Sequence, residues 1–140
     1  MPPAVAAAAT ESLKHLKRSV AERIAHRLQV EKTRRALRKA GIPMMSSQSH
    51  IIPVLVGDPA LCREASSLLL ERFAIYVQPI NYPTVPRGSE RLRITPTPFH
   101  GDRLIDALAD ALDQVWDTLG LLRDSNVVPL SSARRLRPAA

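Results

Sequence analysis

Two arginines separated by a single apolar residue are the side chains of this sequence best placed to do chemistry. They occur in the stretch Arg91-Leu92-Arg93-Ile94-Thr95, where polar and apolar residues alternate. Side chains of a strand point alternately to its two faces, so Arg91, Arg93 and Thr95 are expected to share one face. A planar guanidinium binds a carboxylate through two parallel hydrogen bonds, and a strand fixes it more firmly than a loop does. Two such arginines on one strand face are therefore candidates for binding a carboxylate, and a solvated surface arginine is the alternative interpretation.

The loop that precedes this strand is stiffened by its composition. It reads NYPTVPRG over residues 81–88, and Pro83 and Pro86 restrict its backbone, so little entropy is lost when it closes on a ligand. Gly88 permits the chain to turn back into the strand. We expect this loop to lie beside the arginines.

Other site chemistries find little support in the sequence. Cys62 is the only cysteine, so it cannot form an internal disulfide, and a reducing cytoplasmic compartment fits best. The histidines lack zinc-ligand spacing to Cys62 or to one another. No Ser-His-Asp motif and no glycine-rich phosphate loop is recognisable. The four histidines are His15, His26, His50 and His100.

The elements that must position the site follow from the hydrophobic spacing. A long helix is predicted from Thr10, as its N-cap, to Gly41, as the residue just past its end. Strands are predicted over residues 50–57, 75–80 and 91–95. Pro53 places the first strand at a sheet edge or at a bulge, because proline cannot donate a ladder hydrogen bond.

Two further helices complete the pattern. One is predicted to be capped by Asp58 and to end near Arg72. The other is predicted to be capped by Asp102 and carries the broadest apolar stripe of the chain. This order predicts an α+β fold, in which a small, mostly antiparallel sheet of about three strands carries helices on one face and follows a long N-terminal helix. We divide the chain into a basic linking helix (1–41), an α+β domain (42–124) and a disordered tail (125–140).

The positive charge is concentrated at one end of the chain. The net charge is +7, and residues 1–41 hold ten Lys and Arg against three acids, whereas the remainder holds ten of each. Such a run is compatible with nucleic-acid binding, but no aromatic residue interleaves it and no helix-turn-helix pattern surrounds it. A solvated helix face is the favoured interpretation, and no nucleic-acid partner is expected. No membrane association is expected either, because no apolar run approaches the ~20 residues of a membrane span.

The stretch INYPTVPRGSERLRITPTP (Ile80–Pro98) carries a resemblance to a known family. Together with SHIIPVLVGD (49–58) and IYVQ (75–78), it resembles the C-terminal domain of 5-aminolevulinate synthases. These are α-oxoamine synthases with the aspartate-aminotransferase-type fold that binds pyridoxal phosphate (PLP), of which this chain would form the small domain. The resemblance covers nearly the whole chain and fades after about Leu122.

The resemblance implies a specific activity and specific site residues. The family condenses glycine with succinyl-CoA to give 5-aminolevulinate, CO2 and CoA, the first step of haem synthesis in organisms that use this route. Arg93 would hold the glycine carboxylate, and Thr84 would help to bind the succinyl end. Asn81, Tyr82 and Arg91 would only lie near the site. Arg91 is interpreted as a member of a structural ion pair, with Glu90 or an acid further upstream as its partner.

The resemblance also implies what this chain lacks. In the family, PLP is bound by a lysine and by phosphate-binding residues of a large domain, upstream of everything matched here. The four lysines of this chain do not match that lysine motif, so no catalytic residue and no covalent PLP are expected, and the chain alone should be inactive. The expected partners are the large domain or a full-length synthase subunit, within a homodimer. The alternative is a non-catalytic partner subunit or a remnant of such an enzyme. The lysines are Lys14, Lys17, Lys32 and Lys39.

Overall fold

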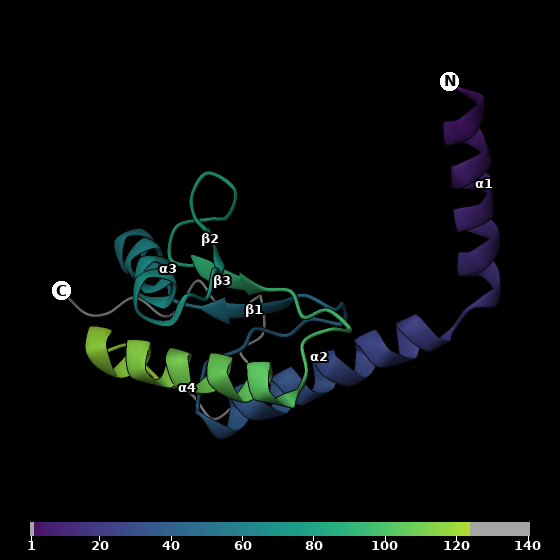
Figure 1. The fold of residues 1–140 in the computed structure, drawn as a ribbon. Helices are drawn as coiled ribbons and strands as arrows, with labels where there is room; N and C mark the ends of the chain where they lie inside the picture. Colours follow the sequence, from purple (N-terminus) through teal and green to yellow (C-terminus); the bar gives the residue numbers. More distant parts are fainter. Residues whose placement is uncertain (1, 124–140) are drawn as a thin grey trace.

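A three-stranded antiparallel sheet with helices packed on one face forms the body of the protein (Figure 1). The structure is a computed structural model and describes residues 2–123. The strand order is β1-β3-β2, so β3 is central. The helices are α1 (Pro3–Arg18), α2 (Ala21–Lys39), α3 (Pro59–Phe73) and α4 (Asp102–Leu119), and the strands are β1 (Ile52–Leu55), β2 (Gln78–Ile80) and β3 (Arg91–Ile94).

The register of β3 separates its apolar side chains from its arginines. Leu92 pairs with Val54, and Ile94 pairs with Ile52, and all four side chains are buried. Because side chains alternate, Arg93 lies on the opposite face. The α+β prediction, with about three antiparallel strands and helices on one face, is confirmed.

The first strand lies at an edge of the sheet, as Pro53 predicts. Pro53 pairs with Arg93 of β3, and its carbonyl accepts a hydrogen bond from the Met45 amide on the outer side, at 2.9 Å. The missing N–H of proline therefore costs the sheet no ladder hydrogen bond.

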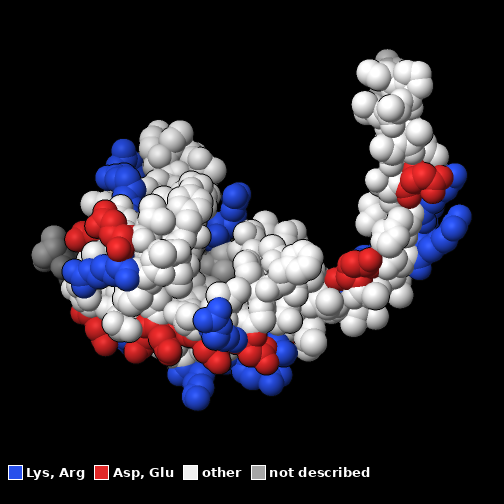
Figure 2. All heavy atoms as spheres, in the orientation of Figure 1, with Lys and Arg blue, Asp and Glu red and all other residues white. Residues whose placement is uncertain are grey.

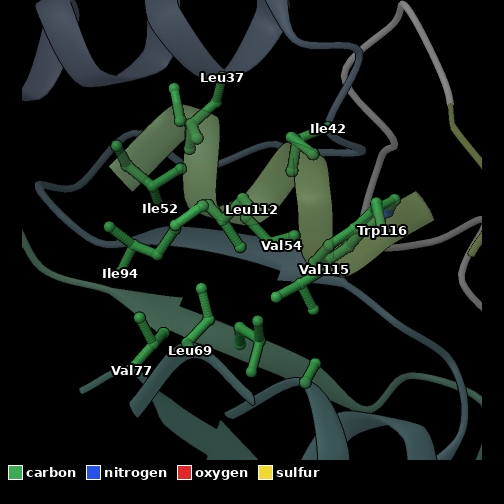
Figure 3. Packing of buried hydrophobic residues seen from close by; sticks show 14 of the residues in the cluster. Leu37, Ile42, Ile52, Val54, Leu69, Val77, Ile94, Leu112, Val115 and Trp116 are labelled. Atoms are coloured by element: carbon green, nitrogen blue, oxygen red, sulfur yellow. The ribbon is translucent and has the colours of Figure 1, made fainter. Parts of the chain in front are cut away.

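The core lies between the sheet and helices α2, α3 and α4 (Figure 3). Trp116 and Leu112 of α4 and Leu69 of α3 are among its largest fully buried side chains, and Leu37 contributes from α2. The core is mainly aliphatic, in line with an aromatic content of 4%. The core therefore supports β3 from one face of the sheet. The opposite face, which carries Arg91 and Arg93, is not covered by these helices.

The N-terminal segment differs from the single long helix predicted over residues 10–41. It forms two helices, and the chain is extended at Ser19, with φ −80° and ψ 131°. The first helix begins at Pro3, so Thr10 lies within α1 and donates its hydroxyl to the Ala6 carbonyl instead of capping. Figure 1 shows α1 projecting away from the body, and none of its residues is buried.

Among the other predicted helix caps, two were correct and one was wrong. Asp58 caps α3, since its Oδ1 accepts hydrogen bonds from the Ala60 and Leu61 amides at 2.8 and 2.9 Å. Gly41 follows α2 with φ +68°, a conformation that favours glycine. Asp102 does not cap α4, whose N-cap is Gly101, and instead accepts a salt bridge from Lys32 at 2.6 Å.

Two further predictions bear on the extent of the fold. The predicted tail, residues 125–140, lies outside the described residues. Within residues 2–123, none of the helices is both long enough and apolar enough to cross a membrane.

Candidate functional site

The candidate site is centred on β3, the middle strand of the sheet. Arg91 pairs with Leu55 of β1 and Ile80 of β2, and Arg93 pairs with Pro53 and Gln78. A strand paired on both sides is held by two ladders of hydrogen bonds, so the Cα positions of its arginines are well fixed. Arg91 and Arg93 therefore share one face, as the alternation predicts.

The two arginines have different surroundings. Arg91 is half-buried, and its guanidinium donates to the Ser89 carbonyl at 2.9 Å and to the Ser89 hydroxyl at 3.2 Å. Burial lowers the pKa of Arg91, and the nearby charge of Glu90 opposes this effect. The prediction that Arg91 forms an ion pair is wrong, because no salt bridge involves it within residues 2–123. Ser89 binds its guanidinium instead. Arg91 thus anchors the end of the loop.

The guanidinium of Arg93 is free to bind a ligand. Arg93 is exposed, and no hydrogen bond or salt bridge involves its side chain within the part of the chain that the structure describes. A guanidinium carries five N–H donors and cannot give up its charge, so it can accept a carboxylate without first breaking another contact.

Arg93 also borders a cavity of about 540 Å³ at the β2 edge of the sheet. It is the one side chain of the Lys, Arg, Asp and Glu types among the lining residues in the described part of the chain. Ile75, Ile94 and Leu108 supply apolar wall, whereas Gln78 and His100 supply polar groups. An apolar cavity with a single fixed charge and few polar groups is the usual form of a small-molecule site.

The loop between β2 and β3 (residues 81–90) is tied down at both ends. The side-chain amide of Asn81 donates to the Pro59 carbonyl at 3.2 Å. The backbone carbonyl of Glu90 accepts from the backbone amides of Val56 and Gly57 at 2.9 Å each. The peptide bond before Pro83 is cis. These contacts hold the loop against the turn that starts α3.

Glu90 closes the base of this loop. Its side chain is fully buried, and one carboxyl oxygen accepts the Gly88 amide at 2.8 Å. Gly88 has φ +81°, which a residue with a side chain adopts only with strain. The other Glu90 carboxyl oxygen and the side-chain oxygen Oδ1 of Asn81 are buried without a hydrogen-bond partner among the described residues.

Thr84 lies on the exposed part of the loop and does not line the Arg93 cavity. Its amide donates to the Asn81 carbonyl at 3.0 Å, and no bond involves its hydroxyl within residues 2–123. The loop leaves the sheet at the end where Ile80 pairs with Arg91, whereas the cavity lies at the Gln78 and Arg93 end. The structure therefore gives Arg93 and Thr84 free polar groups but places them in different surroundings.

Two other loop residues contact each other. The Arg87 guanidinium stacks over the Tyr82 ring at 4.8 Å from its centroid. This cation–π contact holds both side chains on the loop surface. Tyr82 is exposed and lies outside the Arg93 cavity, as Thr84 does.

Four polar residues that line the cavity were not predicted from the sequence, namely Thr33, Tyr76, Gln78 and His100. Gln78 is the register partner of Arg93 and accepts a hydrogen bond from the Tyr76 hydroxyl. The alternation in IYVQ was a usable signal, since it places Tyr76 and Gln78 on one face of an extended segment. No comparable signal marks His100, which reaches the cavity because the chain turns before α4.

The described residues do not form a site for PLP. A PLP enzyme needs a lysine amine and groups that hold a phosphate. All four lysines lie on α1 and α2, Lys14 pairs with Glu11 and Lys32 pairs with Asp102, and no lysine lines the Arg93 cavity. Among residues 2–123 there is also no cluster of three His, Cys, Asp or Glu side chains that could hold a metal ion.

Comparison with protein families gives a match over most of the chain. The model of the family described as aminotransferase class I and II matches residues 1–112. The match includes β3 and the loop before it, and so both predicted site residues.

Similar curated proteins are named 5-aminolevulinate synthase. The protein from Bradyrhizobium diazoefficiens is 57% identical over 121 residues, which are 86% of this chain and 30% of the relative. The protein from Rhizobium meliloti is 55% identical over 123 residues, or 88% of this chain and 30% of the relative. The chain therefore spans about 30% of the length of these relatives.

Solved structures of serine palmitoyltransferase share the fold. The Sphingomonas wittichii enzyme matches with a TM-score of 0.75 and 25% identity, and an S. paucimobilis enzyme solved with bound PLP matches with 0.75 and 22%. Each match covers 86% of this chain and 30% of the solved chain. The architecture of Figure 1 is thus found within larger enzymes.

Proposed function

This chain belongs to the aminotransferase class I and II family, and from that premise we propose that it is the substrate-carboxylate-binding part of a PLP-dependent 5-aminolevulinate synthase. The reaction of the whole enzyme would join glycine to succinyl-CoA, for haem and tetrapyrrole synthesis. The observation that carries the proposal is the free guanidinium of Arg93, fixed on the central strand beside a largely apolar cavity.

Arg93 would bind and orient the carboxylate of glycine. Two parallel N–H···O hydrogen bonds from one guanidinium fix both the position and the plane of a carboxylate. The apolar walls of the cavity would exclude water and so strengthen this charge interaction. The role of Arg93 is therefore positioning of a substrate by its charge, with no proton transfer.

Thr84 would serve the second substrate. Its hydroxyl can donate one hydrogen bond to the succinyl carboxylate and is exposed on a loop fixed at Asn81 and Glu90. A loop anchored at both ends loses little entropy when it contacts a ligand.

Because the described residues do not fit PLP, we assign no cofactor chemistry to this chain. The lysine and the phosphate-binding groups would come from the other ~70% of an enzyme like the relatives, of which this chain spans 30%. The 140-residue chain alone is proposed to be inactive and to act with such a polypeptide, within a homodimer. A cytoplasmic location is part of the proposal and rests on the single, unpaired cysteine.

The test uses a chimera in which this chain replaces the matching 30% of the Bradyrhizobium diazoefficiens relative. We expect the chimera to form 5-aminolevulinate, and Arg93→Lys to raise the KM for glycine about 10- to 100-fold, the effect of losing hydrogen bonds to a charged group. Thr84→Val should raise the KM for succinyl-CoA and leave that for glycine unchanged.

The matched control is Arg63→Lys, an exposed position on α3 that does not line the Arg93 cavity. It should leave both constants unchanged. If the chimera is active and Arg93→Lys changes the KM for glycine no more than Arg63→Lys does, Arg93 does not bind the glycine carboxylate. A folded chimera that forms no 5-aminolevulinate would instead favour the non-catalytic partner subunit.

A further inference from the structure

We propose that a second cavity, beside α2, binds a phosphate group. The cavity has a volume of about 510 Å³ and shares no lining residue with the Arg93 cavity, so the inference goes beyond the proposed function. Its walls come from one face of α2 and from the segment 48–50, which precedes β1. The residues that carry the inference are Arg23, His26, Arg27, Glu31, Arg34 and His50.

The charge of this cavity is strongly positive. Three arginines, Arg23, Arg27 and Arg34, line it together with a single acidic residue, Glu31. The arginine positions differ by four and by seven residues, so the helical repeat brings all three to one face of α2. Like charges one turn apart repel each other, and a bound anion would relieve this repulsion.

Arg34 is already engaged and builds the wall of the cavity. It donates to the Ser47 and Ser49 carbonyls at 2.9 and 2.7 Å, and it pairs with Glu31 at 3.0 Å. These bonds hold the segment that carries His50 against α2. They also leave Glu31 occupied by Arg34, so this carboxylate does not neutralise the other two arginines.

Arg27 is the free cation of the cavity. It is exposed, and no hydrogen bond or salt bridge involves its side chain within residues 2–123. Arg23, one turn earlier, uses one nitrogen to donate to the Leu16 carbonyl at 2.7 Å, which orients its guanidinium. One oriented and one free guanidinium therefore flank the same space.

Two imidazoles add hydrogen-bonding groups to this cavity. The rings of His26 and His50 lie 5.1 Å apart, centroid to centroid. His26 Nε2 is 3.0 Å from the Pro96 carbonyl, which can only accept, so this nitrogen carries the hydrogen and the ring is held in place. No hydrogen bond involves the His50 ring among the described residues, so it can turn toward a ligand.

A phosphate suits this arrangement better than a carboxylate does. The three arginines and Glu31 leave a formal charge of +2, which matches a phosphate dianion. Phosphate presents oxygens in several directions, and the donors lie on both α2 and the segment 48–50. Arginine binds phosphate through two parallel hydrogen bonds, which gives geometric selectivity as well as energy.

The experiment follows the imidazole protons of the full 140-residue chain by NMR during titration with inorganic phosphate, at constant ionic strength set with chloride. We expect saturable shifts of His26 and His50, with little change at His15 and His100. Arg27→Gln should weaken binding about tenfold, as expected for loss of a charge-assisted hydrogen bond.

The matched control is Arg35→Gln. Arg35 is exposed on the same helix but does not line the cavity, so its loss should leave the affinity nearly unchanged. Two results would contradict the proposed site: chemical-shift changes that grow linearly without saturation, or equal weakening of binding by Arg27→Gln and Arg35→Gln. Either result would show that phosphate interacts only with the overall positive charge of the chain. Equal affinity for acetate would overturn the assignment to phosphate.

Discussion

Cys62 shows how burial decides the chemistry of a single residue. Its side chain lies fully within the core on α3, and burial raises the pKa of the thiol to about 11 from a usual value of 9.0. The nearby Glu90 charge adds to this effect, whereas a backbone hydrogen bond at Ile80 opposes it. The reactive form, the thiolate, is therefore scarce at neutral pH.

We predict that Cys62 is inert in the folded chain. The rise in pKa from 9.0 to about 11 lowers the thiolate fraction near neutral pH about a hundredfold, and burial slows access further. Labelling with a thiol reagent should therefore be at least that much slower than in denaturant. Equal rates in the two states would contradict the prediction.

The same shift predicts a loss of stability at high pH. The unfolded thiol loses its proton near pH 9, before the folded one does, so the free energy of unfolding should fall as the pH rises from about 9 to about 11. Chemical denaturation at several pH values measures this. In Cys62→Ala the part of the fall due to the thiol should be absent.

Glu22 is perturbed in the opposite direction at the junction of α1 and α2. It accepts hydrogen bonds from the Ser19 hydroxyl and from His15 at 3.0 Å, across the break between the helices. Hydrogen bonds from Ser19, from its own backbone and from His15 lower the pKa of the carboxyl from 4.5 to about 2. Its charged form thus holds the junction.

We predict that this contact survives to low pH. Because the folded pKa is lowered, its contribution is complete above pH 4.5 and is lost as the pH falls toward 2. The 13C resonance of the Glu22 carboxyl should report this titration. Ser19→Ala should raise the pKa of Glu22 toward 4.5, and Ser47→Ala, which is remote from the junction, should not change it.

At the residue scale, the sequence predicted that Arg93 lies on a strand beside a site, but not that its guanidinium makes no other contact. Alternation alone placed Arg91 and Arg93 on one face, and the structure agrees. It could not tell which one was available, because Ser89 reaches Arg91 only when the loop turns back at Gly88. The positive charge of Arg27 was also evident from the sequence. The second cavity was not, because the segment 48–50 that encloses it meets α2 only in the folded chain.

At the scale of elements, the burial of α4 dominates the packing. Leu112 is fully buried against the sheet, whereas Leu104 on the same helix is 49% exposed. Both leucines belong to the apolar stripe that made α4 the clearest periodic signal in the sequence, but Leu104 borders the Arg93 cavity and is not part of the core. Figure 3 shows Leu112 in the middle of the labelled core side chains and Trp116 toward one side of them.

We predict that Leu112→Ala lowers the free energy of unfolding by about 2–5 kcal/mol, because it removes buried methyl groups and leaves a cavity. Leu104→Ala should cost about 1 kcal/mol or less, since half of that side chain already contacts water. Urea denaturation of both variants measures the difference. Equal losses would mean that the two positions are packed alike.

The break between α1 and α2 shows the limit of periodicity. Leu16, Val20 and Ile24 keep helical spacing straight through it, so the sequence favoured one continuous helix. In the structure the Ser19 hydroxyl bonds to Glu22 and the Ser19 backbone becomes extended. Serine competes with helix formation through such local hydrogen bonds, an effect that hydrophobic spacing does not register.

At the scale of the whole molecule, the first two helices leave a long apolar face uncovered. Its side chains are between 53% and 62% exposed, and they run along α1, across the break and onto α2. Figure 2 shows that charged side chains cover only part of this region and that the first turns of α1 carry none. The face is formed by Leu13, Leu16, Val20, Ile24 and Leu28.

This exposed face predicts binding of an apolar dye. A contiguous apolar surface exposed to water binds such dyes, whereas an isolated apolar side chain does so weakly. We expect the double variant Leu16→Glu, Ile24→Glu to lower the fluorescence of bound anilinonaphthalene sulfonate by about half or more. Leu70→Glu, at a 50% exposed position on α3, should change it little.

The same double variant should not reduce stability, because neither side chain belongs to the core. Its urea midpoint should match that of the unsubstituted chain, which separates loss of surface from loss of fold. A lower midpoint would show that α1 and α2 pack on the body more closely than their exposure indicates. Unchanged fluorescence at an unchanged midpoint would place the dye elsewhere, with the apolar cavity beside Arg93 as the next candidate.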